Sequence, residues 1–109
     1  MPTELPKPLA AYFAAVNTRD IDAMLAPFAE SATVKDEGQE RRGRAAIREW
    51  IVETTTKYGV TIEVLEVAGM APNITVTGHV SGNFPGSPID LRYAFILDGQ
   101  RIARLEITA

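Results

Sequence analysis

Hydrophobic residues in the first half of the chain follow a helical spacing. Apolar side chains that return every three or four positions are typical of amphipathic helices. The three runs are Leu5, Leu9, Tyr12, Phe13 and Val16; Ile21, Met24, Leu25 and Phe28; and Ile47, Trp50, Ile51, Thr54 and Tyr58. We expect a first helix that begins near Pro6 and Pro8, a second capped by Asp20, and a third over residues 44–58 that Gly59 ends.

A short strand is predicted between the second and third helices, over Ala32–Asp36. Side chains alternate along a strand, so Val34 and Asp36 share one face. If Val34 faces the core, Asp36 places a carboxylate at the end of an apolar face, beneath the third helix. Glu37-Gly38 is expected to turn the chain, and the mixed-charge run Glu40–Arg44 to form a solvated loop and helix start.

From Val60 the hydrophobic period changes to two, which predicts strands to the end of the chain. A phase slip at Val64-Leu65 indicates a bulge in the first of these strands. The next strand has an apolar face of Ile74, Val76, Gly78, Val80, Gly82 and Phe84 and a polar face of Thr75, Thr77, His79, Ser81 and Asn83. A turn at Pro85–Pro88 then precedes a strand whose apolar face is Leu91, Tyr93, Phe95 and Leu97.

The last hairpin admits two registers. A two-residue turn at Asp98-Gly99 would place the charged residues Arg104 and Glu106 on the core face. A three-residue loop, Asp98–Gln100, instead aligns Ala103, Leu105 and Ile107 with Phe95, Tyr93 and Leu91. Because the buried face sets the register of a strand, we favour the longer loop.

The order of these elements predicts an α+β fold. Two helices, a short strand, a third helix and four long strands joined by tight turns favour a curved antiparallel sheet with the three helices on its apolar face. Such a sheet, curled around helices, makes a cone with a pocket inside. With 109 residues, the chain is expected to form one domain over residues 1–109.

Composition narrows the function classes. The chain is 46% hydrophobic and 23% charged with a net charge of −3, so it presents no positive field for nucleic acid or an anionic membrane. It has no cysteine and a single histidine, His79, and no phosphate-loop motif, so we expect no disulfide, metal site or cofactor. The N-terminal sequence MPTELPKP lacks the pattern of a signal peptide, and no apolar stretch approaches the ~20 residues of a membrane helix. A cytoplasmic location is expected.

Asp36 is the leading candidate for chemistry. Desolvation disfavours a charged carboxylate, so at the end of an apolar face its pKa should be raised, which makes it a candidate base. An aspartate before Glu-Gly also commonly caps a turn, and that structural role stays open. Tyr12 is either a core tyrosine or a hydroxyl that reaches a cavity. Gly78 and Gly82 either let the sheet bend or leave room for a ligand, and His79 is either exposed or at a subunit contact.

Three segments, AYFAAVNTRDIDAM, FAESATVKDEG and RGRAAIREW, resemble in order and spacing the ketosteroid isomerase branch of the nuclear transport factor two-like superfamily. SnoaL-type polyketide cyclases share that fold. The resemblance is close from Tyr12 to Trp50 and is one of pattern across the strands. It implies a cone-shaped α+β fold, a homodimer through the outer sheet face, and a ligand pocket between helices and sheet.

The resemblance also implies roles for single residues. Tyr12 matches the family's oxyanion-hole tyrosine, and Asp36 matches its general-base aspartate. In that chemistry the carboxylate removes a proton next to a carbonyl, and the tyrosine hydroxyl stabilises the enolate oxygen. The sequence departs from the family in two places: Glu37-Gly38 follows the base where the family has proline, and Tyr93 takes the slot of a second, protonated aspartate. Asp90 is close to that slot but has the wrong strand parity.

Two classes of function remain open, and a partner expected for the pocket is a small hydrophobic molecule. The first is a cofactor-free isomerase or cyclase in which Asp36 is the base and Tyr12 and Tyr93 donate to the oxyanion. The second is a non-catalytic ligand-binding or dimerisation module in which Asp36 only caps a turn. A raised pKa with the carboxylate open to a cavity favours the enzyme, whereas a filled cone or bonds to backbone amides favour the module. The pocket wall is expected to include Trp50, Tyr58, Phe84 and Leu105.

Overall fold

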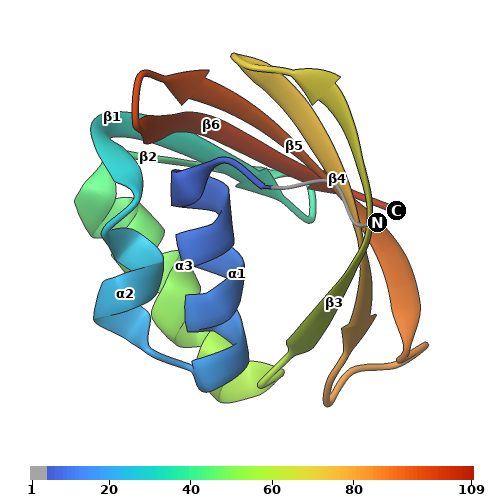
Figure 1. Cartoon of the computed structure of the whole chain (residues 1–109). Coiled ribbons are helices and arrows are strands. Elements are labelled where there is room, and N and C mark those ends of the chain that lie inside the picture. Colours follow the sequence, from blue (N-terminus) through green and yellow to red (C-terminus); the bar gives the residue numbers. More distant parts are fainter. Residues whose placement is uncertain (1–4) are drawn as a thin grey trace.

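Three helices cover one side of a curved six-stranded sheet in the computed structural model, which describes residues 5–109 (Figure 1). The helices are α1 (Lys7–Thr18), α2 (Ile21–Leu25) and α3 (Arg44–Lys57). The strands are β1 (Phe28–Asp36), β2 (Gln39–Arg42), β3 (Thr61–Met70), β4 (Asn73–Ser81), β5 (Ile89–Asp98) and β6 (Arg101–Thr108). The predicted α+β architecture, with the helices inside the curve of the sheet, is confirmed.

The helices begin and end where the sequence predicts. Pro8 lies in the first turn of α1, where a missing N–H does no harm. The Asp20 side chain caps α2 by accepting the Ala23 N–H at 3.1 Å. Gly59 follows α3 with φ of 55°, a conformation that glycine adopts without a steric penalty. None of the helices in residues 5–109 is long and apolar enough to cross a membrane. The segment MPTELPKP includes residues 1–4, which lie outside the described residues.

The sheet is mixed, so the prediction of a wholly antiparallel sheet is wrong at one pair. The strand order is β2-β1-β6-β5-β4-β3, and β1 runs parallel to β6 while the other neighbours are antiparallel. Tight turns fix the direction of consecutive strands only, and β1 is separated from β6 in the chain by one helix and four further strands. In addition, β1 starts at Phe28 and not at Ala32, and β2 forms where a solvated loop was expected.

One bulge each sets the register of the antiparallel pairs β3–β4 and β5–β6. In β3, Val64 pairs with Gly78 and Glu66 with Thr77, which leaves Leu65 as the extra residue and confirms the predicted bulge. The second bulge lies in β6 and overturns the predicted register of the last hairpin.

In that hairpin the turn is Gly99-Gln100, because Asp98 pairs with Arg101. Leu97 then pairs with Ile102 but Ile96 pairs with Arg104, so Ala103 is the extra residue. Beyond it, Phe95 pairs with Leu105 and Tyr93 with Ile107. Neither register considered from the sequence is correct, since the bulge lets both Ile102 and Leu105, each fully buried, face the core.

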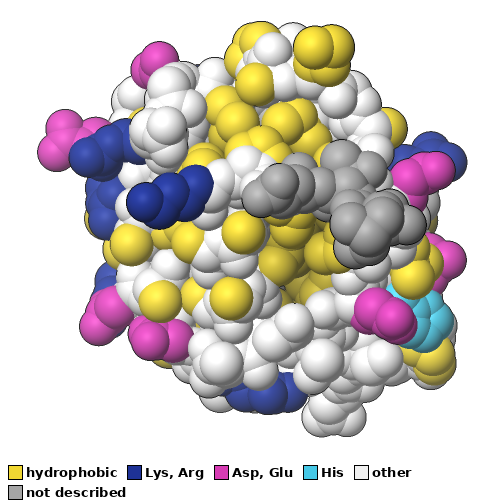
Figure 2. Space-filling view, viewed as in Figure 1, with side chains coloured by type: hydrophobic (Ala, Val, Ile, Leu, Met, Phe, Trp, Pro, Cys, Tyr) yellow, Lys and Arg dark blue, Asp and Glu magenta, His cyan; other side chains and the backbone are white. Residues whose placement is uncertain are grey.

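The core lies between the helices and the sheet and is rich in aromatic rings. Phe13 of α1 packs edge-on against Tyr93 and Phe95 of β5, with ring centroids 5.4 and 5.8 Å apart. Tyr12 packs in the same way against Phe28, at 5.7 Å. Hydrophobic side chains gather in the middle of the face shown in Figure 2, with charged side chains around its rim. This packing ties α1 to the sheet and positions Tyr12 and Tyr93.

Candidate active site

A cavity of about 530 Å³ lies between the helices and the sheet, as the cone-shaped fold predicts. Its volume falls within the range of small-molecule sites, and its wall is mainly apolar. Five aromatic side chains contribute to it: Tyr12, Trp50, Tyr58, Phe84 and Tyr93. Leu105, which was also expected in the wall, instead lies fully buried in the core behind it, and Ile107 of the same strand lines the cavity.

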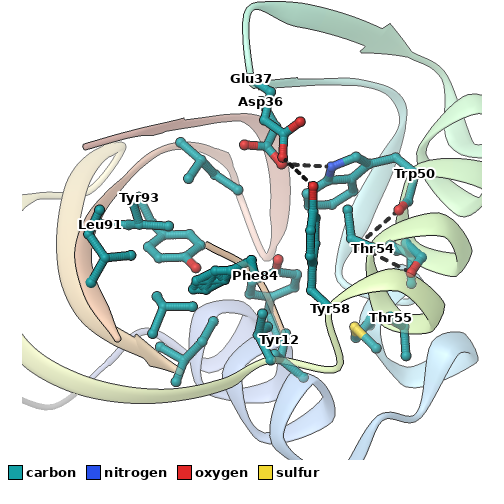
Figure 3. Close-up of a pocket in the computed structure, with 18 of the residues that line it drawn as sticks. Tyr12, Asp36, Glu37, Trp50, Thr54, Thr55, Tyr58, Phe84, Leu91 and Tyr93 are labelled. Atoms are coloured by element: carbon teal, nitrogen blue, oxygen red, sulfur yellow. Dashed lines mark hydrogen bonds between the residues drawn. The ribbon is translucent and has the colours of Figure 1, made fainter. Parts of the chain in front are cut away.

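Asp36 lines this cavity from the end of β1. Its strand parity places it on the face of Val34, which is fully buried, so the carboxylate turns toward α3. There it accepts a hydrogen bond from the indole Nε1 of Trp50 at 3.0 Å (Figure 3). The Asp36 carboxylate is therefore partly shielded from solvent and accepts a hydrogen bond from one side-chain donor, the Trp50 indole.

Burial raises the pKa of Asp36 above its usual value and is the largest influence on it. The negative charge of Glu37 adds to the increase. The Trp50 hydrogen bond, the backbone N–H of Glu37 and the positive charge of Arg41 act in the opposite direction. The raised pKa at the cavity wall meets the condition that favours a base, whereas the contact with the Glu37 backbone N–H is of the kind expected for a turn cap.

Tyr12 and Tyr93 reach the cavity from α1 and β5, and both are 3% exposed (Figure 3). Burial raises the pKa of both phenols, and the negative charge of Asp36 raises them further. At neutral pH both hydroxyls are therefore protonated donors. Figure 3 shows no hydrogen bond between either hydroxyl and the other side chains drawn. Two buried phenols near one carboxylate are thus free to bind a ligand oxygen.

Glu37 is a pocket residue that the sequence reading treated only as part of a turn. Glu37 and Gly38 have φ of 54° and 76°, and Asp36 pairs with Gln39, which defines a two-residue hairpin turn of the primed type. A non-glycine residue with positive φ is uncommon. The turn directs the Glu37 carboxylate to the cavity, where the Tyr58 hydroxyl donates to its Oε1 at 3.2 Å.

Gly82 shapes the rim of the cavity. A Cβ at Gly82 would lie 2.9 Å from the Tyr58 carbonyl oxygen, so only glycine lets the two segments meet. The next residue, Asn83, donates its N–H to that same carbonyl at 2.8 Å. This contact brings Phe84 against Tyr58, with ring centroids 5.9 Å apart. The loop after β4 is therefore docked onto the end of α3.

Neither glycine that the sequence singled out lines the cavity. A Cβ at Gly78 would meet the Ile62 Cγ2 at 2.8 Å and the Tyr93 Cε1 at 3.4 Å. The space over Gly78 is therefore filled by the chain's own side chains, not by a ligand. His79, on the outer face of the same strand, pairs across to Asp90 at 2.7 Å.

No three potential metal-binding side chains converge anywhere in residues 5–109. The side chains of the described pocket wall offer two carboxylates, several hydroxyls and the indole N–H of Trp50. Arg19 also lines the cavity, but its guanidinium donates to the Gly59 carbonyl at 2.6 Å and to Thr61 Oγ1 at 3.3 Å. This arrangement suits acid–base chemistry on an uncharged ligand.

Comparison with known families identifies the class of this protein. Residues 9–104 match the SnoaL-like domain, so the chain belongs to the SnoaL-like family. A search of curated proteins found no match.

Solved structures agree with that assignment. A Sinorhizobium meliloti protein, SMa1630, provisionally assigned as a polyketide cyclase, is 40% identical with a TM-score of 0.91, and the match covers 95% of each chain. SalBIII, an epoxide hydrolase/cyclase-like enzyme of pyran ring formation in salinomycin, is 28% identical with a TM-score of 0.81, over 93% of this chain and 86% of that one. A Catenulispora acidiphila protein with a ketosteroid isomerase-like fold, solved with trimethylamine, is 19% identical with a TM-score of 0.84, over 97% and 87%, and shows the shared fold.

Proposed function

We propose that this protein is a cofactor-free isomerase or cyclase that removes a proton from the carbon next to a carbonyl of a small hydrophobic substrate. The observation that carries the proposal is the placement of Asp36, Tyr12 and Tyr93 around one apolar cavity. Burial makes the Asp36 carboxylate a stronger base than it is in water, and two neutral phenols can stabilise the enolate oxygen.

The proposed reaction needs only proton transfer within the pocket. Asp36 takes the proton from carbon, and the electron pair moves onto the carbonyl oxygen, which Tyr12 and Tyr93 stabilise. In an isomerase, Asp36 returns the proton to another carbon of the enolate. In a cyclase, the enolate carbon attacks a second carbonyl carbon of the same molecule, and the oxygen of that carbonyl takes up the electron pair and receives the proton from Asp36. The assignment of the relative SMa1630 as a polyketide cyclase supports this class of chemistry.

Two assays test the proposal. The first follows formation of the conjugated enone from a 3-oxo steroid with an unconjugated double bond, and the second follows exchange of the α-hydrogens of 2-tetralone in D₂O by NMR. Asp36→Asn should lower either rate by about 10²–10⁴-fold, as expected for loss of a general base. Asp98→Asn is the control, because Asp98 is exposed at the turn between β5 and β6. Equal rates in the two variants would refute the role of Asp36, and ligand binding without turnover would favour a binding module.

A homodimer through the outer face of the sheet is also proposed, from the resemblance of the chain to its family. Ile96 supports it, because this side chain points away from the core face of β5 and is 40% exposed. A cytoplasmic location stays a prediction.

A further inference from the structure

We propose that Trp50 is a positioning residue for Asp36: its indole N–H holds Oδ2 of the carboxylate and leaves Oδ1 to meet the ligand. The inference rests on the proposed function, in which Asp36 is the base. The sequence predicted Trp50 only as part of the pocket wall. The proposal gives this residue a second role, which is to hold and orient the base.

The first support is the way in which Trp50 is held. The side chain is 6% exposed, and its neighbours on α3, Ile47 and Ile51, are 0% and 1% exposed, so this face of the helix is locked into the core. An indole has a single N–H donor, and here that donor is spent on Asp36 at 3.0 Å. If the ring turned away from Asp36, its buried N–H would lose its acceptor, which is energetically unfavourable.

The second support is that Asp36 and Trp50 belong to one short stretch of chain. β1 ends at Asp36, the turn at Glu37 and the short β2 reverse the chain, and α3 then runs back along β1. The Gly43 N–H, at the start of α3, donates to the Ala32 carbonyl of β1 at 2.8 Å. The local hairpin thus presents the indole edge to the carboxylate (Figure 3).

The third support is the balance of influences on the base. The titratable and charged groups around Asp36 are Glu37 beside it, Arg41 on β2, and the phenols of Tyr12 and Tyr93. Glu37 raises the pKa of Asp36 and Arg41 lowers it, but among the groups that favour the ionised form the Trp50 hydrogen bond ranks first.

This balance explains what the indole would contribute. A base in an apolar pocket holds its proton more tightly, and that makes it a strong acceptor but also leaves fewer molecules ionised near neutral pH. A donor aimed at the carboxylate stabilises the ionised form without adding a charge or water. Trp50 would therefore keep Asp36 available as a base while fixing the plane of its carboxylate.

The test removes the indole N–H and measures the pKa of Asp36 directly, by titrating its side-chain carboxyl ¹³C signal by NMR. Trp50→Phe should raise that pKa by about one unit, the size expected for a hydrogen bond to a charged group. Tyr58→Phe is the matched control, since it removes a pocket hydroxyl that donates to Glu37 and not to Asp36, and its shift should be smaller.

An isosteric replacement guards against a folding defect. Trp50 is the only tryptophan, so biosynthetic incorporation of benzothienylalanine changes this one site, keeping the shape of the ring and replacing the N–H by sulfur. It should reproduce the shift of Trp50→Phe. An unchanged pKa in either folded variant would overturn the inference, whether or not the protein is an enzyme.

The pH profile of kcat/KM separates positioning from packing. With the N–H removed, the acid limb should move to higher pH by the same amount as the NMR titration, and activity should recover on the alkaline side. A loss by one constant factor at every pH would instead indicate a packing defect and overturn the inference. Because the titration needs no substrate, a shifted pKa without any turnover would refute the proposed function alone.

Discussion

The side-chain amide of Asn17 brackets the backbone of Ile62: its Oδ1 accepts the Ile62 N–H at 2.7 Å, and its Nδ2 donates to the Ile62 carbonyl at 2.9 Å. Ile62 belongs to β3, an edge strand, whose outer backbone groups have no strand partner. The amide therefore continues the sheet for one residue. It also ties the end of α1 to the sheet and so helps to hold Tyr12 at the cavity.

Replacing this amide should destabilise the fold. Asn17→Ala removes two hydrogen bonds and leaves partly buried backbone groups without partners, so we expect the free energy of unfolding to fall by about 2 kcal/mol. Urea denaturation measures the change. The control is Thr18→Ala, because the Thr18 hydroxyl bonds only to carbonyls of its own helix, at 3.1 and 3.3 Å. Equal losses in the two variants would contradict a special role for Asn17.

Asp36 should lower the stability of the protein at neutral pH. Its pKa is raised in the folded state, so between pH 3.8 and that raised value the folded state binds more protons than the unfolded state, and stability falls as pH rises. Asp36→Asn stays uncharged and keeps an oxygen for the Trp50 N–H. We expect it to melt at a higher temperature than the native chain at neutral pH, with the difference vanishing below pH 3.8. A difference independent of pH would argue against this linkage.

The two phenols should matter for activity and not for stability. Tyr12→Phe and Tyr93→Phe keep the packed rings and remove hydroxyls for which Figure 3 draws no protein hydrogen bond. Each should leave the melting temperature nearly unchanged and lower kcat by about 10²–10³-fold, as for loss of one oxyanion donor. Thermal unfolding and the enone assay measure the two effects. Normal turnover in both variants would remove them from the oxyanion site.

Gly78 offers a test of close packing next to the pocket. In Gly78→Ala the new methyl group would lie 2.8 Å from Ile62 Cγ2 and 3.4 Å from Tyr93 Cε1, so these side chains must shift. We expect a loss of about 1–3 kcal/mol in the free energy of unfolding, together with weaker ligand binding as Tyr93 moves. Thr77→Ala, on the opposite face of β4, is the control. Unchanged stability in Gly78→Ala would contradict the prediction, because it would mean that the neighbouring side chains accommodate the methyl group without cost.

The proposed dimer can be tested on the outer face of β5. Ile96→Glu places a charge on a side chain that is 40% exposed and points away from the core, so folding should be unaffected. If two copies pair through this face, the variant should become monomeric, because burying an unpaired charge is unfavourable. Light scattering after size exclusion gives the mass. A monomeric native chain would refute the proposed dimer.

Local patterns predicted much of this fold. The helix ends at Asp20 and Gly59 follow from capping chemistry, and the bulge at Leu65 follows from a slip in the alternation of β3. Both signals need only neighbouring residues. Glu37 could not be recognised in the same way, because glutamate is not a usual residue for the primed turn that directs it to the cavity.

Periodicity and parity are local properties of the chain, so they were enough to predict that Asp36 ends an apolar strand face and that three helices precede a set of long strands. Three features arise from long-range packing and could not be predicted in this way: β1 lies parallel to β6, Ala103 bulges, and Leu105 lies behind the cavity. These outcomes depend on which side chains compete for one core. Packing of α3 in the same core also brings the Trp50 indole to Asp36. The short sequence separation of the two residues makes this contact possible but does not by itself predict it.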